Sequence, residues 1–219
     1  KHRVVFKSWG KINVLCYSLL YDNMAENKLS IAIAGGQCTG KSVTSAALFA
    51  HLKIHGLDYD FISEEHRKLI SEFGDYRSSF DRFYMWRQQE REELRSTARN
   101  GFITDAPLFH FYASAKMYAS EPRDNLAVRE LFRMCLEIND RYQLIVIAED
   151  PAELPYKTDS CRHAGREKAF KKHQIVRSFV EHHYPEKLLL VRGTLDKRIL
   201  QIEDELKRRG SEFKELPYK

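Results

Sequence analysis

The chain has 219 residues and a formal net charge of +5, with 43% hydrophobic and 31% charged residues. This balance excludes an intrinsically disordered chain, which would be poor in apolar residues, and a collagen-like chain, since there are only 10 glycines and 6 prolines. The length fits one domain with a small appended element, and no apolar run approaches the ~20 residues that a membrane-spanning helix needs.

Residues 1–28 differ from the rest of the chain because they are basic and weakly patterned. Met24 resembles a translation start just ahead of the first strong strand, so we expect Lys1–Asn23 to be an upstream or expression-derived extension. The alternative is a genuine N-terminal strand or helix packed on the core, because Val4–Phe6 and Ile12–Leu20 are apolar. The expected division is an N-terminal extension over residues 1–28 and one domain over residues 29–219.

From Leu29 onward, short apolar runs alternate with longer helical patterns. This alternation is typical of a parallel sheet that helices cover on both faces, with right-handed crossovers. The expected strands are Leu29–Ala34, Leu57–Ile62, Gly101–Asp105, Tyr142–Ala148 and Lys187–Val191. The expected helices are Ser42–His55, Glu64–Phe73, Phe80–Ala98, Leu108–Ala119, Asn125–Asn139, Arg166–His182 and Leu195–Arg209.

The strongest motif follows the first strand and opens the first helix. It fits G-x-x-x-x-G-K-[ST] at every fixed position, a pattern whose backbone N–H groups surround phosphate oxygens at the positive end of a helix. We expect Lys41 to reach the β- and γ-phosphates and the Ser42 hydroxyl to bind Mg²⁺. Cys38 is interpreted as a tolerated small residue rather than a reactive thiol. The expected phosphate-binding residues are Gly35, Gly36, Gln37, Cys38, Thr39, Gly40, Lys41 and Ser42.

Two carboxylates lie at the carboxyl ends of predicted strands. Asp105 ends the third strand, where a metal-binding carboxylate is expected, and we favour this role over the alternative, an N-cap for a helix starting near Pro107. Glu64 follows the second strand, from which it would face an acceptor hydroxyl and take its proton. The alternative for Glu64 is a charge that complements the dipole at a helix start.

Arginines and aromatic residues complete the candidate site. Arg162 and Arg166 lie in a polar, Gly-containing stretch after the fourth strand, where a closing lid at about 156–168 would bring cations to the phosphate; surface arginines explain them equally well. The helix Phe80–Ala98 offers aromatic and polar side chains that would hold a substrate base or phosphate, or pack in the core. These candidate substrate residues are Trp86, Arg87, Gln88 and Arg91.

Cysteine spacing and charge distribution narrow the kinds of metal site and partner that we expect. No cysteine pair has the CxxC spacing of a zinc site, and the histidines show no ligand spacing with a Cys or Asp partner. No secretory signal is visible, which predicts a reduced, cytoplasmic setting.

The positive charge is distributed unevenly along the chain. Residues 1–28 carry a net charge of +3, residues 29–156 carry −4 and residues 157–188 carry +4. Because the positive charge is local, it gives little support to a nucleic-acid partner.

Taken in order, these segments resemble the P-loop ATPase/kinase proteins common in tailed bacteriophages, which are related to the ribosylnicotinamide kinase domain of bacterial NAD regulators. The resemblance covers about Leu29–Gly193. It rests on Gly35–Ser42, Ile62-Ser63-Glu64, Gln88-x-x-Arg91, Ile103–Leu108, and the stretch from Tyr156 and Arg162 to Ala169.

The resemblance implies a nucleoside- or nucleotide-kinase-like fold with a helical lid that binds ATP and Mg²⁺, in the host cytoplasm if the protein is phage-encoded. By this match Glu64 faces the acceptor, Asp105 supports the metal and Arg162 is the lid arginine. Cys161 stands where the family usually has glycine, so Arg162 and Arg166 compete for the lid role.

The expected architecture is a three-layer α/β fold whose five parallel strands have the order 2-3-1-4-5. The expected reaction is Mg²⁺-ATP-dependent transfer of a phosphoryl group to a nucleoside, a nucleotide or a hydroxyl carried by a nucleic acid. The alternative is an ATP-hydrolysing or ATP-sensing module that acts on a protein or nucleic-acid partner.

Overall fold

The computed structural model describes residues 28–64, 79–148 and 165–214. Most of the expected N-terminal extension lies outside these residues. So do the expected helix Glu64–Phe73 beyond Glu64 itself, and the larger part of the expected lid, with Arg162.

A five-stranded parallel sheet forms the centre of the molecule and confirms the predicted order, β2-β3-β1-β4-β5. In register, Ile31 of the central strand lies between Ile103 and Leu144 of its neighbours. The parallel arrangement brings the carboxyl ends of all five strands to one edge. The strands are β1 (Ile31–Ala34), β2 (Tyr59–Ile62), β3 (Gly101–Thr104), β4 (Leu144–Ala148) and β5 (Leu188–Val191).

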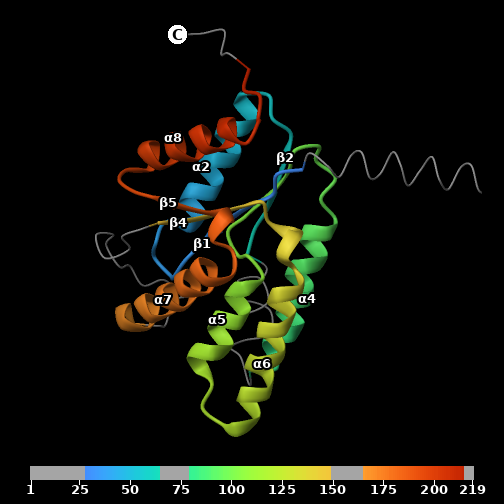
Figure 1. Cartoon of the computed structure of the whole chain (residues 1–219), viewed down its shortest axis with the longest axis vertical. Helices are drawn as coiled ribbons and strands as arrows, with labels where there is room; N and C mark the ends of the chain where they lie inside the picture. Colours follow the sequence, from blue (N-terminus) through green and yellow to red (C-terminus); the bar gives the residue numbers. More distant parts are fainter. Residues whose placement is uncertain (1–27, 65–78, 149–164, 215–219) are drawn as a thin grey trace, which may run out of the picture.

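Helices cover both faces of the sheet (Figure 1). Two helices, α2 (Lys41–Ile54) and α8 (Leu195–Arg208), lie side by side on one face. The other face carries a larger helical layer, in which neighbouring helices contact one another. This layer consists of α4 (Asp81–Leu94), α5 (Phe109–Tyr118), α6 (Pro122–Glu137) and α7 (Arg166–His183), with short 3₁₀ turns η1 (Asn139–Arg141) and η2 (Pro185–Lys187).

Alternation along the strands divides the core into two apolar clusters. Ile31 and Ile33 of β1 face α2 and α8, where they pack with Leu48 and Ile202. The alternate residues of the same strands face the larger helical layer, where Phe109 is central. Burial of each large apolar side chain contributes about 1.5–3 kcal/mol, so each cluster holds its helices against one face of the sheet.

The ends of two helices differ from the sequence-based expectation for identifiable reasons. Helix α4 stops at Leu94 rather than Ala98, because the Asp60 carboxylate accepts hydrogen bonds from the backbone N–H groups of Thr97 and Ala98. Helix α6 begins at Pro122, three residues before the expected start, because Glu121 and Asp124 form a reciprocal capping box ahead of it.

Candidate active site around the loop 35–42

The loop between β1 and α2 lies at the carboxyl edge of the sheet. Gly40 precedes the first turn of α2 with φ +80°, and its carbonyl accepts the Thr44 N–H at 2.8 Å. Cys38 has φ +60°, the one positive φ at a non-glycine position within the described ranges. A left-handed residue inside such a loop turns successive amides toward a common centre, as anion binding requires.

Two buried histidines hold the amides at the start of the loop. The Gly35 N–H donates to Nε2 of His110 on α5 at 3.2 Å, and the Gly36 N–H donates to Nδ1 of His173 on α7 at 3.3 Å. Each of these ring nitrogens must carry a lone pair to accept. Burial holds the pKa of His110 well below its ordinary value, and the positive charges of Lys172 and Lys41 add to this effect. His110 is therefore neutral, as its hydrogen bond needs.

Helix α7 packs directly against the loop at Gly36. A Cβ atom at this position would lie 2.3 Å from the Ala169 carbonyl oxygen and 2.9 Å from Cβ of His173. Since both obstacles belong to the same helix, a side chain at Gly36 would force the loop and α7 apart. Gly36, at a variable position of the motif, is thus required by this close approach.

Helix α8 holds the loop from the other face. The buried Arg198 guanidinium donates from Nη1 to the Thr39 carbonyl at 3.2 Å and from Nε to the Gly193 carbonyl at 2.9 Å. Inside the loop, Thr39 Oγ1 and Lys41 Nζ both donate to the Gly36 carbonyl, at 3.0 and 2.5 Å. The loop is therefore fixed by α5, α7 and α8 together.

The charges of several side chains near the loop act on Lys172. Lys172 on α7 is only 8% exposed. Its burial lowers its pKa to about 8; the Glu64 carboxylate opposes this shift, while the positive charges of Lys41 and Arg82 add to it. These electrostatic effects mean that the end of β2, the start of α4 and the middle of α7 converge near the loop.

Asp105 follows β3 and is 5% exposed. Helix α5 begins at Phe109 with Leu108 as its N-cap residue, so the interpretation of Asp105 as an N-cap is wrong. Thr104 Oγ1 accepts hydrogen bonds from Gln89 Nε2 and from the Ala106 N–H, both at 3.2 Å. These bonds fix the backbone on both sides of Asp105.

A second polar contact fixes the far end of the same connection. The Leu108 N–H donates to the Tyr142 hydroxyl at 2.9 Å, and this hydroxyl donates to the Glu93 carboxyl at 2.9 and 3.0 Å. Burial raises the pKa of Glu93 to about 8, although the bond from Tyr142 opposes the shift. Glu93 is therefore mostly protonated at neutral pH, which removes the cost of burying a charge.

The candidate substrate residues on α4 are dispersed. Trp86 is 3% exposed and belongs to the apolar cluster, which favours the packing interpretation for it. Arg87 is exposed and pairs with Glu90, Gln88 is half-buried and Arg91 is exposed. Arg166 is exposed at the first turn of α7.

Sequence reasoning missed the residues that hold or surround the loop from a distance. They come from helices that meet only in the folded chain, and no local spacing identifies them. These residues are Arg82, His110, Lys172, His173 and Arg198.

The parallel sheet, the strand–loop–helix order and the fixed loop define a P-loop nucleotide-binding domain. The chain belongs to the AAA domain family, whose model matches residues 30–198. None of the curated proteins compared with the chain matches it. Among the described residues, no helix is long and apolar enough to cross a membrane.

Solved structures of kinases share the fold. The NadR protein in complex with NAD and AMP-PNP aligns with a TM-score of 0.66 and 17% identity, covering 89% of this chain and 53% of that one. NadR in complex with NR aligns with a TM-score of 0.62 and 19% identity, covering 89% and 55%. The chain thus spans about half the length of these NadR chains.

Deoxyadenosine kinase from M. mycoides, with the products dCMP and dCDP bound, aligns with a TM-score of 0.57 and 14% identity. The alignment covers 83% of this chain and 100% of the kinase. At these identities the likeness establishes the fold, a P-loop kinase-like one.

Proposed function

We propose that the protein is a Mg²⁺-ATP-dependent phosphotransferase that moves the γ-phosphate to a nucleoside, a nucleotide or a nucleic-acid-borne hydroxyl. The observation that carries this proposal is that Lys172 lies buried on α7, the helix that packs against Gly36, and that the charges of Lys41 and Glu64 act on it. Two cations and one carboxylate in this region suit a reaction that needs charge neutralisation and an acceptor hydroxyl held in place.

The loop and Lys41 would bind the triphosphate. Backbone N–H groups of the loop and the positive end of α2 favour phosphate oxygens, and Lys41 adds a mobile point charge. Lys172, which is buried on α7 and whose pKa the charge of Lys41 lowers, would supply a second positive charge to the transferred group. Arg166 and Arg162 would add cations from a lid at about 156–168.

Ser42 and Asp105 suit a Mg²⁺ ion. Ser42 lies in the first turn of α2, and Asp105 follows β3, the strand that pairs directly with β1. A hydroxyl and a carboxylate on adjacent parts of the fold are the hard oxygen donors that Mg²⁺ prefers. Bound there, the ion would neutralise charge that develops on the phosphate oxygens.

Glu64 would face the acceptor. It is half-buried at the end of β2, and its charge reaches both Lys172 and His110. In this position its carboxylate would accept a hydrogen bond from the acceptor hydroxyl and receive the proton as the phosphoryl group transfers.

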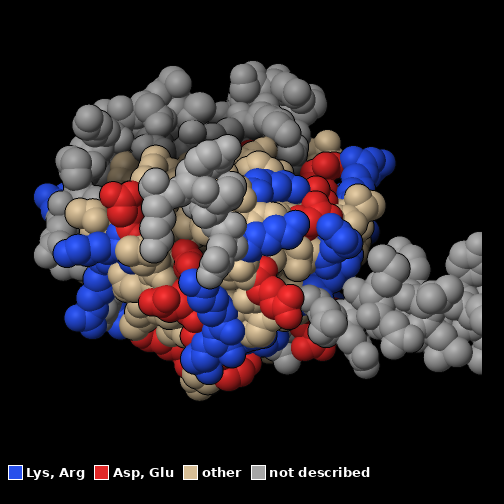
Figure 2. Space-filling view, turned by 90° about the horizontal axis from the view of Figure 1, so that it is seen from above, with Lys and Arg blue, Asp and Glu red and all other residues tan. Residues whose placement is uncertain are grey.

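A nucleoside-type small molecule is the favoured acceptor. The similar NadR and deoxyadenosine kinase structures hold NR, dCMP and dATP, ligands of this type. On the face seen in Figure 2, Lys and Arg side chains alternate with Asp and Glu instead of forming one basic surface. A nucleic-acid backbone favours a continuous basic surface.

We propose further that residues 29–219 form the working domain and that residues 1–28 are an extension.

The test is a screen for labelled phosphate transferred from γ-labelled ATP. Nucleosides, nucleotides, and single- and double-stranded DNA are offered to the full chain with Mg²⁺. Incorporation into one of these acceptors supports the proposal and names the acceptor class. ATP consumption that is independent of every acceptor and responds to a protein or nucleic acid would instead support the alternative, an ATP-hydrolysing or ATP-sensing regulatory module.

A further inference from the structure

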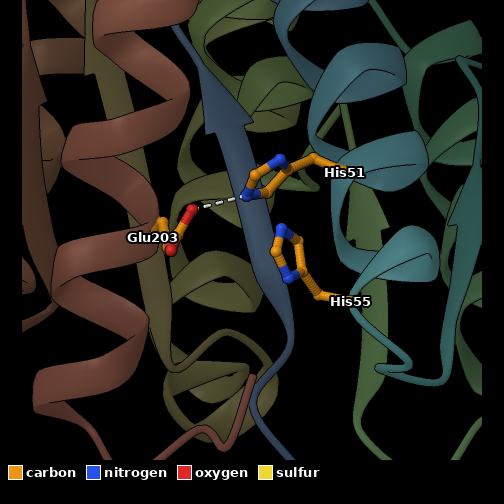
Figure 3. Close-up of side chains that lie close together, drawn as sticks. All are labelled: His51, His55 and Glu203. Atoms are coloured by element: carbon orange, nitrogen blue, oxygen red, sulfur yellow. Dashed lines mark hydrogen bonds and ion pairs between the residues drawn. The ribbon is translucent and has the colours of Figure 1, made fainter. Parts of the chain in front are cut away.

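Three side chains meet at the end of α2 farthest from the phosphate-binding loop. His51 lies in the last turn of α2 and His55, four residues later, is the C-cap residue of this helix, so their rings leave the same side of it. Glu203 faces them from α8, as Figure 3 shows. One potential ligand atom from each of the three residues lies within 4.8 Å of the other two.

The hydrogen bonds of this cluster indicate which ring nitrogens carry the proton and which carry a lone pair. His51 Nε2 lies 2.6 Å from Oε2 of Glu203. His55 Nδ1 lies 2.9 Å from the Lys214 carbonyl oxygen, which only accepts, so Nδ1 of the neutral ring carries the proton and Nε2 carries the lone pair. An outer N–H bonded to a carbonyl is the arrangement that orients metal-bound histidines.

The Glu203 carboxylate serves two partners through different oxygens. Its Oε1 pairs with the Lys207 ammonium one turn further along α8, while its Oε2 faces His51. The carboxyl end of α2 adds the negative end of a helix dipole. The Phe213 ring, 5.5 Å from that of His55, limits access of water from one side.

We propose that His51, His55 and Glu203 form a binding site for a first-row transition dication of the Zn²⁺ class. Two imidazoles and one carboxylate are a ligand set that such ions accept, with a fourth position for water, whereas Mg²⁺ prefers oxygen ligands alone. Ligand atoms about 3.3 Å apart suit a tetrahedral ion with bonds of about 2.0–2.1 Å, which small side-chain rotations provide from the observed arrangement.

Binding would change the tautomer of His51. The proton on Nε2 of neutral His51, which now faces Glu203, would move to Nδ1 by exchange with solvent, so that the ring stays neutral and Nε2 offers its lone pair to the metal ion. The ion would join α2 to α8, whose ligands are 152 residues apart in sequence. It would therefore stabilise the folded chain by an amount that grows with the logarithm of the free ion concentration.

This site is separate from the proposed Mg²⁺ site. The two ends of the 14-residue helix α2 are about 20 Å apart at the α-helical rise. The inference therefore stands whether or not the proposed phosphotransferase activity does.

The experiment titrates Co²⁺ and Zn²⁺ into the metal-free full chain. Co²⁺ binding is followed by its visible d–d absorption and Zn²⁺ binding by calorimetry, with Mg²⁺ as a comparison. We expect the variants His51→Gln, His55→Gln and Glu203→Gln each to weaken binding by about tenfold or more. His182→Gln, which removes an exposed histidine on α7, is the matched control and is expected to bind as the unmodified chain does.

Absence of Co²⁺ absorption in the unmodified chain, or unchanged binding in both histidine variants, would overturn the proposal. An equal loss in His182→Gln would do the same. X-ray absorption of the Zn²⁺-loaded unmodified chain needs no variant to fold. We expect nitrogen and oxygen ligands with two imidazoles, and a sulfur-ligated ion would contradict the assignment.

Discussion

The two ends of α2 carry two sites that were built in different ways. The amino-terminal end follows a contiguous motif, Gly35–Ser42, which is visible in the sequence and which α5, α7 and α8 then hold in shape. The carboxyl-terminal end has no such motif, because His51 and His55 become a candidate site only when Glu203 arrives from α8. The difference teaches that a binding loop formed by consecutive residues can be recognised from the sequence. A cluster of side chains from distant helices can be recognised only in the folded structure.

The largest effect is expected from Lys41→Ala. Removing this point charge from the loop should lower phosphoryl transfer by at least about 10³-fold, while stability changes by no more than about 1 kcal/mol, the size expected for the loss of the hydrogen bond to the Gly36 carbonyl. Transfer assays and thermal unfolding measure the two quantities. Undiminished turnover in this variant would refute the proposed function.

Gly36→Ala tests how tightly α7 holds the loop. The new Cβ would meet the Ala169 carbonyl at 2.3 Å, so we expect a loss of about 1–3 kcal/mol in the free energy of unfolding and a strong loss of nucleotide affinity. The control is Gly165→Ala, where a Cβ would meet nothing within 4 Å. Equal stabilities of the two variants, measured by denaturant titration, would show that the loop is not held by this contact.

Lys172→Met tests the second cation of the site. A phosphate bound beside Lys172 raises its pKa from about 8, so nucleotide binding should take up protons near pH 8 and weaken as the pH rises further. Calorimetry in two buffers of different ionisation enthalpy measures this uptake. We expect the variant to lose the uptake and to bind about tenfold more weakly.

The neighbouring Lys171→Met is the matched control for this experiment, because Lys171 is exposed on the same helix. Its proton uptake and affinity should equal those of the unmodified chain. If both variants lose the uptake equally, Lys172 is not the group that titrates on binding.

The smallest effect on phosphoryl transfer is expected from Glu93→Gln, which changes stability through the support of the β3–α5 connection. The folded pKa of Glu93, about 8, lies above its unfolded value of 4.5, so the folded chain holds this proton more tightly. Its contribution to stability is complete below about pH 4.5 and is lost as the pH rises to about 8. Glu93→Gln should remove this loss and gain on the order of 3 kcal/mol at pH 7.

Unfolding measured across this pH range tests the expectation, with Glu92→Gln as control. Glu92 is partly exposed and pairs with Arg95 on the surface of α4, so its substitution should change stability by only a few tenths of a kcal/mol. A Glu93→Gln chain that keeps the full pH dependence of the unmodified chain would contradict the assignment to this carboxyl.

Element types were accessible to sequence reasoning because the patterns are local. The strand Tyr142–Ala148 was expected from its apolar run, and β4 occupies Leu144–Ala148. Element ends were less accessible. Helix α4 ends early because Asp60, a residue of β2, captures the backbone N–H groups that would continue it. The sequence around the end of a helix does not show that a distant side chain competes for its backbone hydrogen bonds.

By itself, the sequence determined the alternation of strands and helices and the phosphate-binding loop, because periodicity and glycine positions act over a few residues. The strand order pairs strands far apart in the chain, so it was expected from the P-loop kinase-like class and not from a local pattern. Only the tertiary structure decided which side chains complete the loop. His110, His173 and Lys172 reach it because parallel strands collect their carboxyl ends, and the helices that follow them, at one edge of the sheet. Burial then sets the protonation of His110 and Lys172, which depends on three-dimensional surroundings and not on neighbours in the chain.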